Sequence, residues 1–292
     1  METAEATAKP LLSIPIFDSG RHDGEGKSRN VTAAEIQRTD ITNRNDGLFH
    51  IDVSMVTCVH GVWSGEDRTP ASFIVFHCEI NSLEDYYVKK VKLQWEFVND
   101  QVSAPSNPTI AARGPHLVRK YNSSDVDHHD EIGIDAGIEA ETIVNPGLNF
   151  HWNGAKDYKK QYFETARSGV EHASEKDHRY TKAWWIYTQN KQTKQGISAG
   201  FRIAVLIKRQ NDSPFKGLFT LIEFDAGWKY KAAIGWKDFF AKRPPNVDDP
   251  VNFDPTVERV GGKDIDKDAL GALKTDTGIG REYAWIWGVD VE

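Results

Sequence analysis

Three segments of the chain alternate apolar with polar residues, and a fourth segment is mostly apolar. The alternating segments begin at Phe49, Val91 and Phe201, and in each of them every second residue is apolar. A period of two places these apolar side chains on one face of an extended strand and the polar ones on the other. Residues 73–80 are apolar at most positions, which is typical of a central strand.

Further strands are predicted where short apolar runs lie between polar connectors. They cover residues 132–144, 183–187, 218–224 and 283–289. The turn-forming residues 81–85 separate the strand at 73–80 from the strand that begins at Val91, so we predict that these two strands form a hairpin. Short helical segments are predicted at residues 33–38, 163–174 and 234–242.

The order of these elements favours an all-β fold. No long segment with the period of a helix recurs between the strands, so βαβ units are disfavoured. We expect a mostly β fold, an antiparallel β-sandwich or a flattened barrel with one or two short helices. Residues 1–46 are predicted to form a flexible N-terminal arm, and residues 47–292 a single β-sandwich domain. Within that domain, residues 241–280 are predicted to form a long polar loop near the C-terminus.

Composition narrows the classes of partner. The 292 residues carry a formal net charge of −7. A protein that binds DNA without regard to sequence is usually basic, because phosphate contacts supply most of its affinity, so no nucleic-acid partner is expected. The N-terminus lacks the features of a signal peptide, and no run of about 18 apolar residues is available to span a membrane. Cys58 and Cys78 lie in apolar, strand-like runs and are expected to be buried. We therefore expect a cytoplasmic protein.

Two segments resemble motifs of nucleotide-binding or hydrolytic enzymes, and their context favours simpler explanations. Residues 196–200 fit the G-x-S-x-G pattern of serine hydrolases, with Ser198 as the nucleophile. That motif requires a helix after the serine, and here an alternating strand follows, so we interpret the segment as a hairpin turn with glycines at positive φ. Residues 26–28 resemble the end of a phosphate-binding loop, but Arg21 stands where that motif requires glycine.

Acidic clusters at residues 125–131 and 264–268 contain side chains that can bind metals. Both fail the calcium-loop pattern, because Asp130 and Ala269 occupy the positions that require glycine. We interpret both clusters as solvated acidic loops and predict no metal site. No dinucleotide fingerprint, kinase motif set or zinc-protease motif is present, so we predict no cofactor either.

Tryptophan is unusually frequent, with nine in the chain. Trp184 and Trp185 are adjacent on a predicted strand, so one should face the core and the other the opposite side of the sheet. Aromatic rings also stack on sugars and flat ligands. The predicted ligand-binding residues are Trp184, the loop residues His151 and Trp152, and Arg202 on the strand that begins at Phe201.

Taken together, several of these strands and turns resemble a β-rich family of unknown function from filamentous ascomycete fungi. The resemblance lies in residues 71–76, 92–97, 183–185, 190, 196–197 and 201–209, and it covers about residues 70–225. It implies a shared fold and a fungal source. No catalytic residues are known for that family, so the resemblance implies no activity.

These observations lead to three hypotheses of function. The leading one is a non-enzymatic, intracellular β-sandwich that binds a protein or a small hydrophobic or aromatic-stacking ligand. The second is a cofactor-independent cyclase or isomerase of fungal secondary metabolism, which would shape its substrate in an aromatic-lined pocket. The third is an incompatibility or cell-death factor that self-associates, which would make the protein a homo-oligomer. A filled core with an exposed aromatic patch would favour the first hypothesis.

Overall fold

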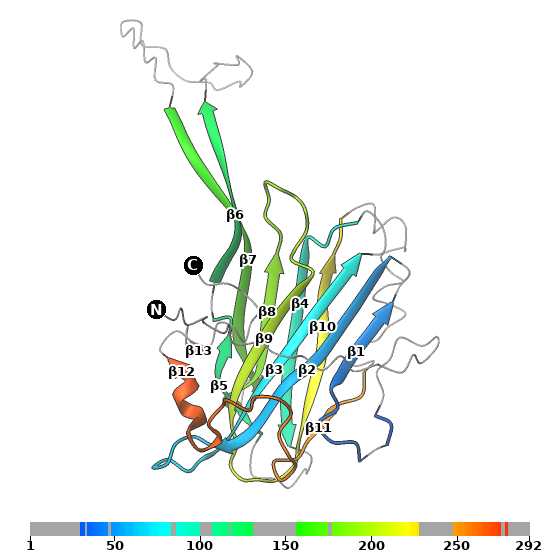
Figure 1. Cartoon of the computed structure of the whole chain (residues 1–292), viewed down its shortest axis with the longest axis vertical. Helices are drawn as coiled ribbons and strands as arrows, with labels where there is room; N and C mark the ends of the chain where they lie inside the picture. The colour runs from blue at the N-terminus through cyan, green and yellow to red at the C-terminus, as the bar shows by residue number, and fades with distance from the viewer. Residues whose placement is uncertain are drawn as a thin grey trace, which may run out of the picture.

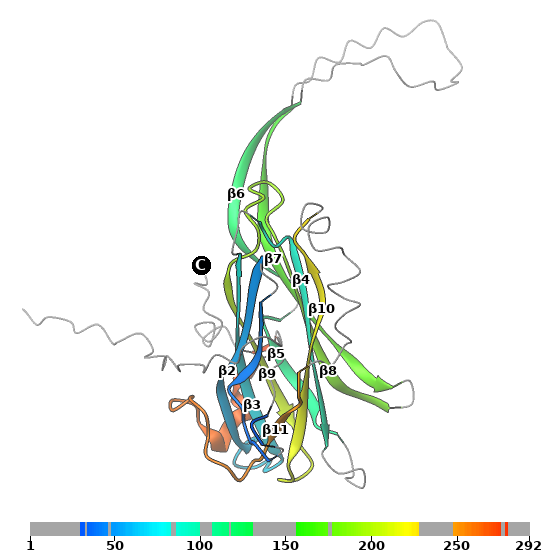
Figure 2. The same ribbon diagram turned by 90° about the vertical axis from the view of Figure 1, so that its right-hand side faces the viewer.

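Two antiparallel sheets pack face to face in this computed structural model (Figures 1 and 2). The structure describes residues 30–32, 34–45, 48–82, 86–99, 107–116, 118–130, 156–174, 177–227, 248–275 and 278–279. The five-stranded sheet has the order β1-β2-β3-β9-β5, and the six-stranded sheet has the order β11-β10-β4-β8-β7-β6. The predicted β-sandwich is confirmed, and the strands of the described residues do not close into a barrel.

The strands of both sheets come from all parts of the described chain. The five-stranded sheet contains β1 (Asp40–Asn45), β2 (Phe49–Val62), β3 (Pro70–Ser82), β9 (Gly200–Lys208) and β5 (Thr109–Gly114). The six-stranded sheet contains β11 (Val251–Phe253), β10 (Phe215–Asp225), β4 (Lys90–Asn99), β8 (Asp177–Thr188), β7 (Lys156–Ser174) and β6 (Val118–Asp130). A 3₁₀-helix, η1 (Lys267–Leu273), leads into a small two-stranded sheet of β12 (Lys274–Thr275) and β13 (Gly278–Ile279).

The strands predicted from alternation are confirmed where the structure describes them. The segments that begin at Phe49, Val91 and Phe201 lie in β2, β4 and β9, and their apolar residues face the space between the sheets. Residues 73–80, 183–187 and 218–224 lie in β3, β8 and β10. The predicted strands 132–144 and 283–289 and the predicted helix 234–242 lie outside the described residues.

The predicted hairpin of the strands at 73–80 and Val91 and the predicted helix at 163–174 are wrong. β3 and β4 do not form a hairpin, because β3 pairs with β2 and β9 whereas β4 pairs with β8 and β10. The chain passes from β3 in one sheet to β4 in the other. Residues 163–174 form part of β7 instead of a helix. There, buried Glu164, Ala166 and Ser168 alternate with more exposed neighbours. The sequence does not show this period of two as a hydrophobic pattern, because the buried positions carry polar or small residues.

Aromatic side chains fill the space between the sheets. Trp95 of β4 stacks on Phe76 of β3, with ring centres 4.1 Å apart. Phe215 and Phe253 stack at the β10–β11 edge with ring centres 4.9 Å apart. Each of these aromatic residues is almost completely buried, and both cysteines are buried as free thiols, as predicted. The two sheets therefore enclose a filled core.

A second apolar cluster lies on the outer face of the five-stranded sheet. Phe73 and Val75 of β3 point away from the main core and pack beneath Leu270 and Leu273 of η1. β3 is thus buried on both faces, which explains its nearly continuous apolar sequence. The described part of the predicted polar loop at 241–280 therefore contains β11, η1, β12 and β13, and η1 packs on the outer face of the five-stranded sheet.

The N-terminal segment joins the edges of the two sheets. Ile36 forms a parallel bridge with Asn252 of β11, and the backbone N–H of Gln37 donates to the Asn252 carbonyl at 2.7 Å. β1 then pairs with β2 in the other sheet. Residues 34–45 of the predicted arm thus run from the six-stranded to the five-stranded sheet, and the predicted helical turns at 33–38 are wrong for the residues described there.

β6 and β7 continue as a two-stranded ribbon beyond the end of the sandwich (Figures 1 and 2). Residues 125–130, predicted as an acidic loop, belong to β6 and pair with residues 156–161 of β7. The prediction that this cluster is a loop is therefore wrong for its described residues.

Candidate functional site

Trp184 and Trp185 face opposite sides of β8, as their adjacency predicts. Trp185 is completely buried between the sheets, where its indole Nε1 donates to the backbone oxygen of Gly114 at 3.0 Å. Trp184 is partly exposed on the outer face of the six-stranded sheet. Trp185 is therefore the core residue, and Trp184 is the tryptophan whose position suits contact with a ligand.

Trp184 belongs to a row of side chains that crosses four strands. It pairs with Gly169 of β7 on one side and with Gln94 of β4 on the other, and Gln94 pairs with Thr220 of β10. Directly paired residues of antiparallel strands point to the same face of a sheet. Gly169, Trp184, Gln94 and Thr220 therefore form one line, here called the Trp184 row. With strands about 4.8 Å apart, its backbone length is roughly 14 Å.

Gly169 provides the space for the indole ring. A Cβ atom at this position would lie 2.2 Å from a ring carbon of Trp184, much closer than two carbon atoms can approach. The indole therefore extends over the backbone of β7, in space that any larger residue at 169 would fill. This places the ring along the sheet surface, where one of its faces can form a platform.

Charged side chains border the Trp184 row. The Nζ atom of Lys182 lies 3.5 Å from a carboxylate oxygen of Glu96, and that of Lys90 lies 2.8 Å from a carboxylate oxygen of Glu223. The Nζ atom of Lys92 lies 5.4 Å from the centre of the Trp184 ring, a distance typical of a cation–π interaction. The two ion pairs offset their own charges, and the row between them contains no charged residue.

The other predicted ligand-binding residues do not join this row. Arg202 lies on the outer face of the five-stranded sheet, on the opposite side of the sandwich, where it pairs across strands with His77. Burial lowers the pKa of the Arg202 guanidinium, and burial together with Arg202 lowers the pKa of His77. His151 and Trp152 lie outside the described residues, so their roles stay predictions.

Residues 196–200 connect the two sheets. They lead from β8 in one sheet to β9 in the other, so the predicted hairpin turn is wrong, although Gly196 has the predicted positive φ, at 88°. The backbone N–H and the hydroxyl of Ser198 both donate to the carboxylate of Glu164, each at 2.9 Å. Glu164 is 2% exposed. The role of Ser198 that this geometry supports is to anchor the connection to β7.

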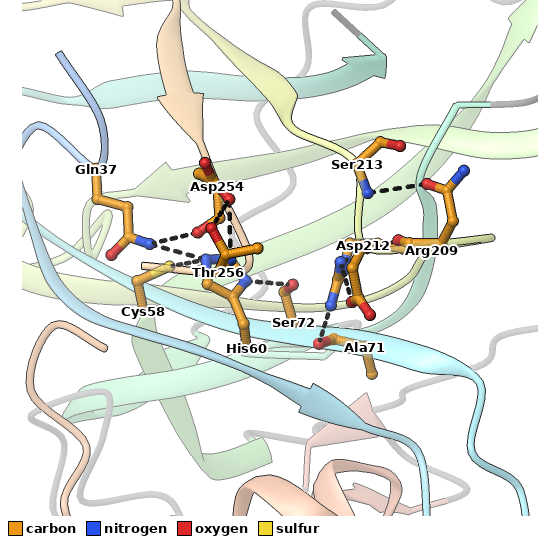
Figure 3. A network of polar contacts seen from close by, with 11 residues as sticks. Gln37, Cys58, His60, Ala71, Ser72, Arg209, Asp212, Ser213, Asp254 and Thr256 are labelled. Atoms are coloured by element: carbon orange, nitrogen blue, oxygen red, sulfur yellow. Dashed lines mark hydrogen bonds and ion pairs between the residues drawn. The ribbon is translucent and has the colours of Figure 1, made fainter. Parts of the chain in front are cut away.

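A second group of polar residues surrounds His60 inside the sandwich (Figure 3). A β-bulge after Met55 lets Cys58 and His60 of β2 both point inward. The Nδ1 atom of His60 lies 2.7 Å from the Ser72 hydroxyl, and its Nε2 atom lies 3.1 Å from the Gln37 amide nitrogen. The sulfur of Cys58 lies 3.4 Å from the same Nε2 atom.

These contacts hold His60 in its neutral form. The Gln37 amide nitrogen is a donor, so Nε2 accepts its hydrogen bond and Nδ1 carries the proton that is donated to Ser72. Burial lowers the pKa of His60 to about 4, Arg209 adds to this effect, and Asp254 and Asp212 oppose it. A neutral imidazole satisfied in this way stabilises the packing of β2 on β3 and on the N-terminal segment.

The chemistry around His60 does not favour nucleophilic catalysis. A cysteine nucleophile reacts as a thiolate, and complete burial raises the pKa of the Cys58 thiol far above its usual range. Above His60 lies a surface hollow of about 640 Å³, which residues 255–259 and 265–268 line together with Val59. None of the described residues that line it is Phe, Tyr or Trp, the residues that form the aromatic platform of a shape-selecting enzyme pocket.

The sequence did not single out most of these residues. Gln94 occupies a solvent-facing position of a predicted strand. Its neighbours in the row depend on which strands pair, and the strand pairing could not be predicted from the sequence. Gln37 lies in the predicted arm, and His60 follows a bulge that interrupts the alternation of β2. Within the described residues, no group of three or more His, Cys, Asp or Glu side chains is close enough to hold a metal ion.

No protein-family model and no curated protein matches the chain. The resemblance to proteins of filamentous ascomycete fungi therefore stays a prediction. None of the helices in the described residues has both the length and the apolar character needed to cross a membrane.

Proposed function

We propose that this chain is an intracellular binding protein that recognises its ligand with the outer face of the six-stranded sheet and needs no cofactor. The observation that carries the proposal is Trp184, an indole held along the sheet surface over Gly169 while its neighbour Trp185 fills the core. Aromatic residues placed with one apolar face accessible are frequent in binding surfaces.

The other described tryptophans have structural contacts that account for them. Trp95 and Trp185 are fully buried between the sheets. Trp63 packs against Gly271 of η1 and lies beneath the ammonium group of Lys208, 3.9 Å from its ring centre. Trp184 differs from these three in its packing. Trp95 and Trp185 belong to the main apolar cluster and Trp63 packs against the second one, whereas Trp184 belongs to neither cluster of the described residues.

The filled core supports a binding protein more than the alternative of a cyclase or isomerase. Such an enzyme needs an apolar cavity between the sheets, and aromatic residues such as Trp95, Phe76 and Phe97 occupy that space. The hollow above His60 is lined mostly by loop residues, several of them charged. The outer sheet face therefore has the stronger case as the recognition surface.

A ligand panel tests the proposal. The wild-type chain and Trp184→Ala are titrated with adenosine, with neutral hexasaccharides and with a random peptide array, with intrinsic fluorescence or array signal as the readout. We expect at least one class to bind saturably to the wild type and roughly tenfold more weakly to the variant, which is the loss of one stacking contact. Binding by no class, or binding that ignores the substitution, would contradict the proposal.

A further inference from the structure

We infer that the ligand of the Trp184 row is a neutral oligosaccharide that lies across strands β7, β8, β4 and β10. This inference rests on the proposed function and adds the chemical class of the ligand. It follows from the uncharged donors and acceptors of the row, from its length, and from the pairing of the strands beneath it.

The row combines an aromatic platform with neutral hydrogen-bonding groups. The apolar face of a sugar ring can pack on the indole of Trp184, and its hydroxyls can exchange hydrogen bonds with the amide of Gln94 and the hydroxyl of Thr220. These two side chains can both donate and accept, as a hydroxyl-rich ligand requires. They continue the row from the indole toward β10.

The length of the row favours a chain of sugar rings over one flat heterocycle. A single heterocycle on Trp184 would leave Gln94 and Thr220, one and two strands away, without contact. The roughly 14 Å from β7 to β10 suit a ligand with repeated rings and hydroxyls. A short oligosaccharide can contact all four positions of the row at once.

The strands under the row disfavour a peptide that binds as an added strand. β4 and β8 each pair on both sides, whereas β10 pairs with β4 along residues 215–225 and, in the described part of the chain, with β11 at residues 215–217 alone. The backbone groups beneath Trp184 and Gln94 are therefore used within the sheet, and strand addition, which requires a free edge, is disfavoured at these positions. A ligand here must bind through side chains, which suits hydroxyl groups more than a peptide backbone.

The charges beside the row nearly balance, which disfavours a polyanionic ligand: the cations Arg167, Lys182, Lys92 and Lys90 lie on the same face as Glu171, Glu96 and Glu223. Lys182 and Lys90 are paired with Glu96 and Glu223, so neither presents an unopposed positive charge. Lys92 contacts the ring of Trp184 through its flexible side chain. It can rotate away when a sugar ring packs on the indole, so we expect the cation to border the site without contributing to affinity.

Isothermal titration of the full chain with cellohexaose, laminarihexaose, chitohexaose and xylohexaose tests the inference. We expect at least one of these hexasaccharides to bind. Its affinity should change by less than roughly twofold between 50 and 500 mM salt, because the contacts are uncharged. Trp184→Ala should weaken binding roughly tenfold. Gly169→Ala should also weaken it although the indole is retained, because the added methyl group displaces the ring.

Two variants serve as controls. Tyr180→Ala removes an exposed aromatic residue of β8 that lies outside the row, and it should leave the affinity unchanged. Lys92→Met should not weaken binding. A loss of binding in Lys92→Met or at high salt would overturn the inference, because it would identify an anionic ligand. Circular dichroism of each variant checks that the fold is retained.

The results separate the inference from the proposed function. If no hexasaccharide binds but adenosine or a peptide binds in a manner that depends on Trp184, the saccharide inference fails and the binding function stands. If nothing on the panel binds, both fail. Saturable hexasaccharide binding that survives Trp184→Ala would overturn the inference as well, because it would place the sugar elsewhere.

Discussion

At the scale of single residues, adjacent side chains on one strand serve opposite purposes. Trp185 packs in the centre of the sandwich and donates a hydrogen bond to Gly114, whereas Trp184 lies along the outer surface. The sequence predicts that the two rings lie on opposite faces of the sheet, because adjacent side chains of any strand point to opposite faces. It does not predict which ring faces inward, since that depends on the partner strands.

This difference predicts unequal effects of the two tryptophans on stability. Trp185→Ala should lower the free energy of unfolding by about 3–5 kcal/mol, because it leaves a large cavity in a filled core. Trp184→Ala should lower it by about 1 kcal/mol or less, as expected of a surface position. Urea denaturation measures both values. Equal losses would mean that the outer face of the six-stranded sheet is packed like the core.

At the scale of elements, alternation identifies strands only where the buried residues are apolar. β2, β4 and β9 satisfy this condition and are predictable. β7 is not, because its inward positions carry Glu164, Ala166 and Ser168. Glu164 accepts two hydrogen bonds from Ser198 across the sheets, a contact that satisfies a buried carboxylate and that no local pattern reveals.

Strand order is the other element-scale property that sequence does not state. Turn residues after β3 indicate that the chain reverses, yet β4 lies in the opposite sheet. The Trp184 row draws its residues from β7, β8, β4 and β10, so its existence depends on this order. Trp184 could be predicted from the sequence, whereas its row partners Gly169, Gln94 and Thr220 could not, because they are identified only by the pairing of the strands.

The covering segment around η1 should contribute strongly to stability. Leu270 is fully buried against the outer face of the five-stranded sheet, so Leu270→Ala should lower the free energy of unfolding by about 2–5 kcal/mol. Val257, which is 40% exposed on the same stretch of chain, provides the matched control: Val257→Ala should change it by less than about 0.5 kcal/mol. If both substitutions have the same small effect in chemical denaturation, η1 does not cover the sheet as described.

At the scale of the whole molecule, polar contacts join the two sheets at both lateral edges. At one edge, the Ser168 hydroxyl donates to the Pro115 carbonyl at 2.6 Å and accepts from Arg113 at 3.0 Å. At the other edge, Gln37 donates to the Asp254 carbonyl at 3.2 Å and contacts His60. Because His60 takes part in the contact at this edge, the free energy of unfolding of the whole molecule depends on the protonation of one imidazole.

The neutral state of His60 predicts a loss of stability in acid. Its folded pKa of about 4 lies below the unfolded value of 6.5. Above pH 6.5 both states are neutral. As the pH falls from 6.5 to 4, the His60 imidazole becomes protonated in the unfolded state but stays neutral in the folded state. The free energy of unfolding therefore decreases by up to roughly 3 kcal/mol.

Comparison of the wild type with His60→Gln isolates this contribution from other titrating groups. The variant should be less stable at pH 7, and its stability should decline less between pH 6.5 and 4. His50→Gln, at a half-exposed position of the same strand, serves as the control and should keep the decline of the wild type. Parallel declines in the wild type and His60→Gln would show that the imidazole is not held neutral.

The double burial of β3 also has a consequence for biosynthesis. Phe73 and Val75 leave the ribosome long before Leu270 and Leu273, which cover them in the finished fold. At typical translation rates of about 5–20 residues per second, the delay is on the order of tens of seconds. During that time a nascent chain with a completed β2–β3 hairpin displays an apolar surface, which makes it a substrate for chaperones that act during translation.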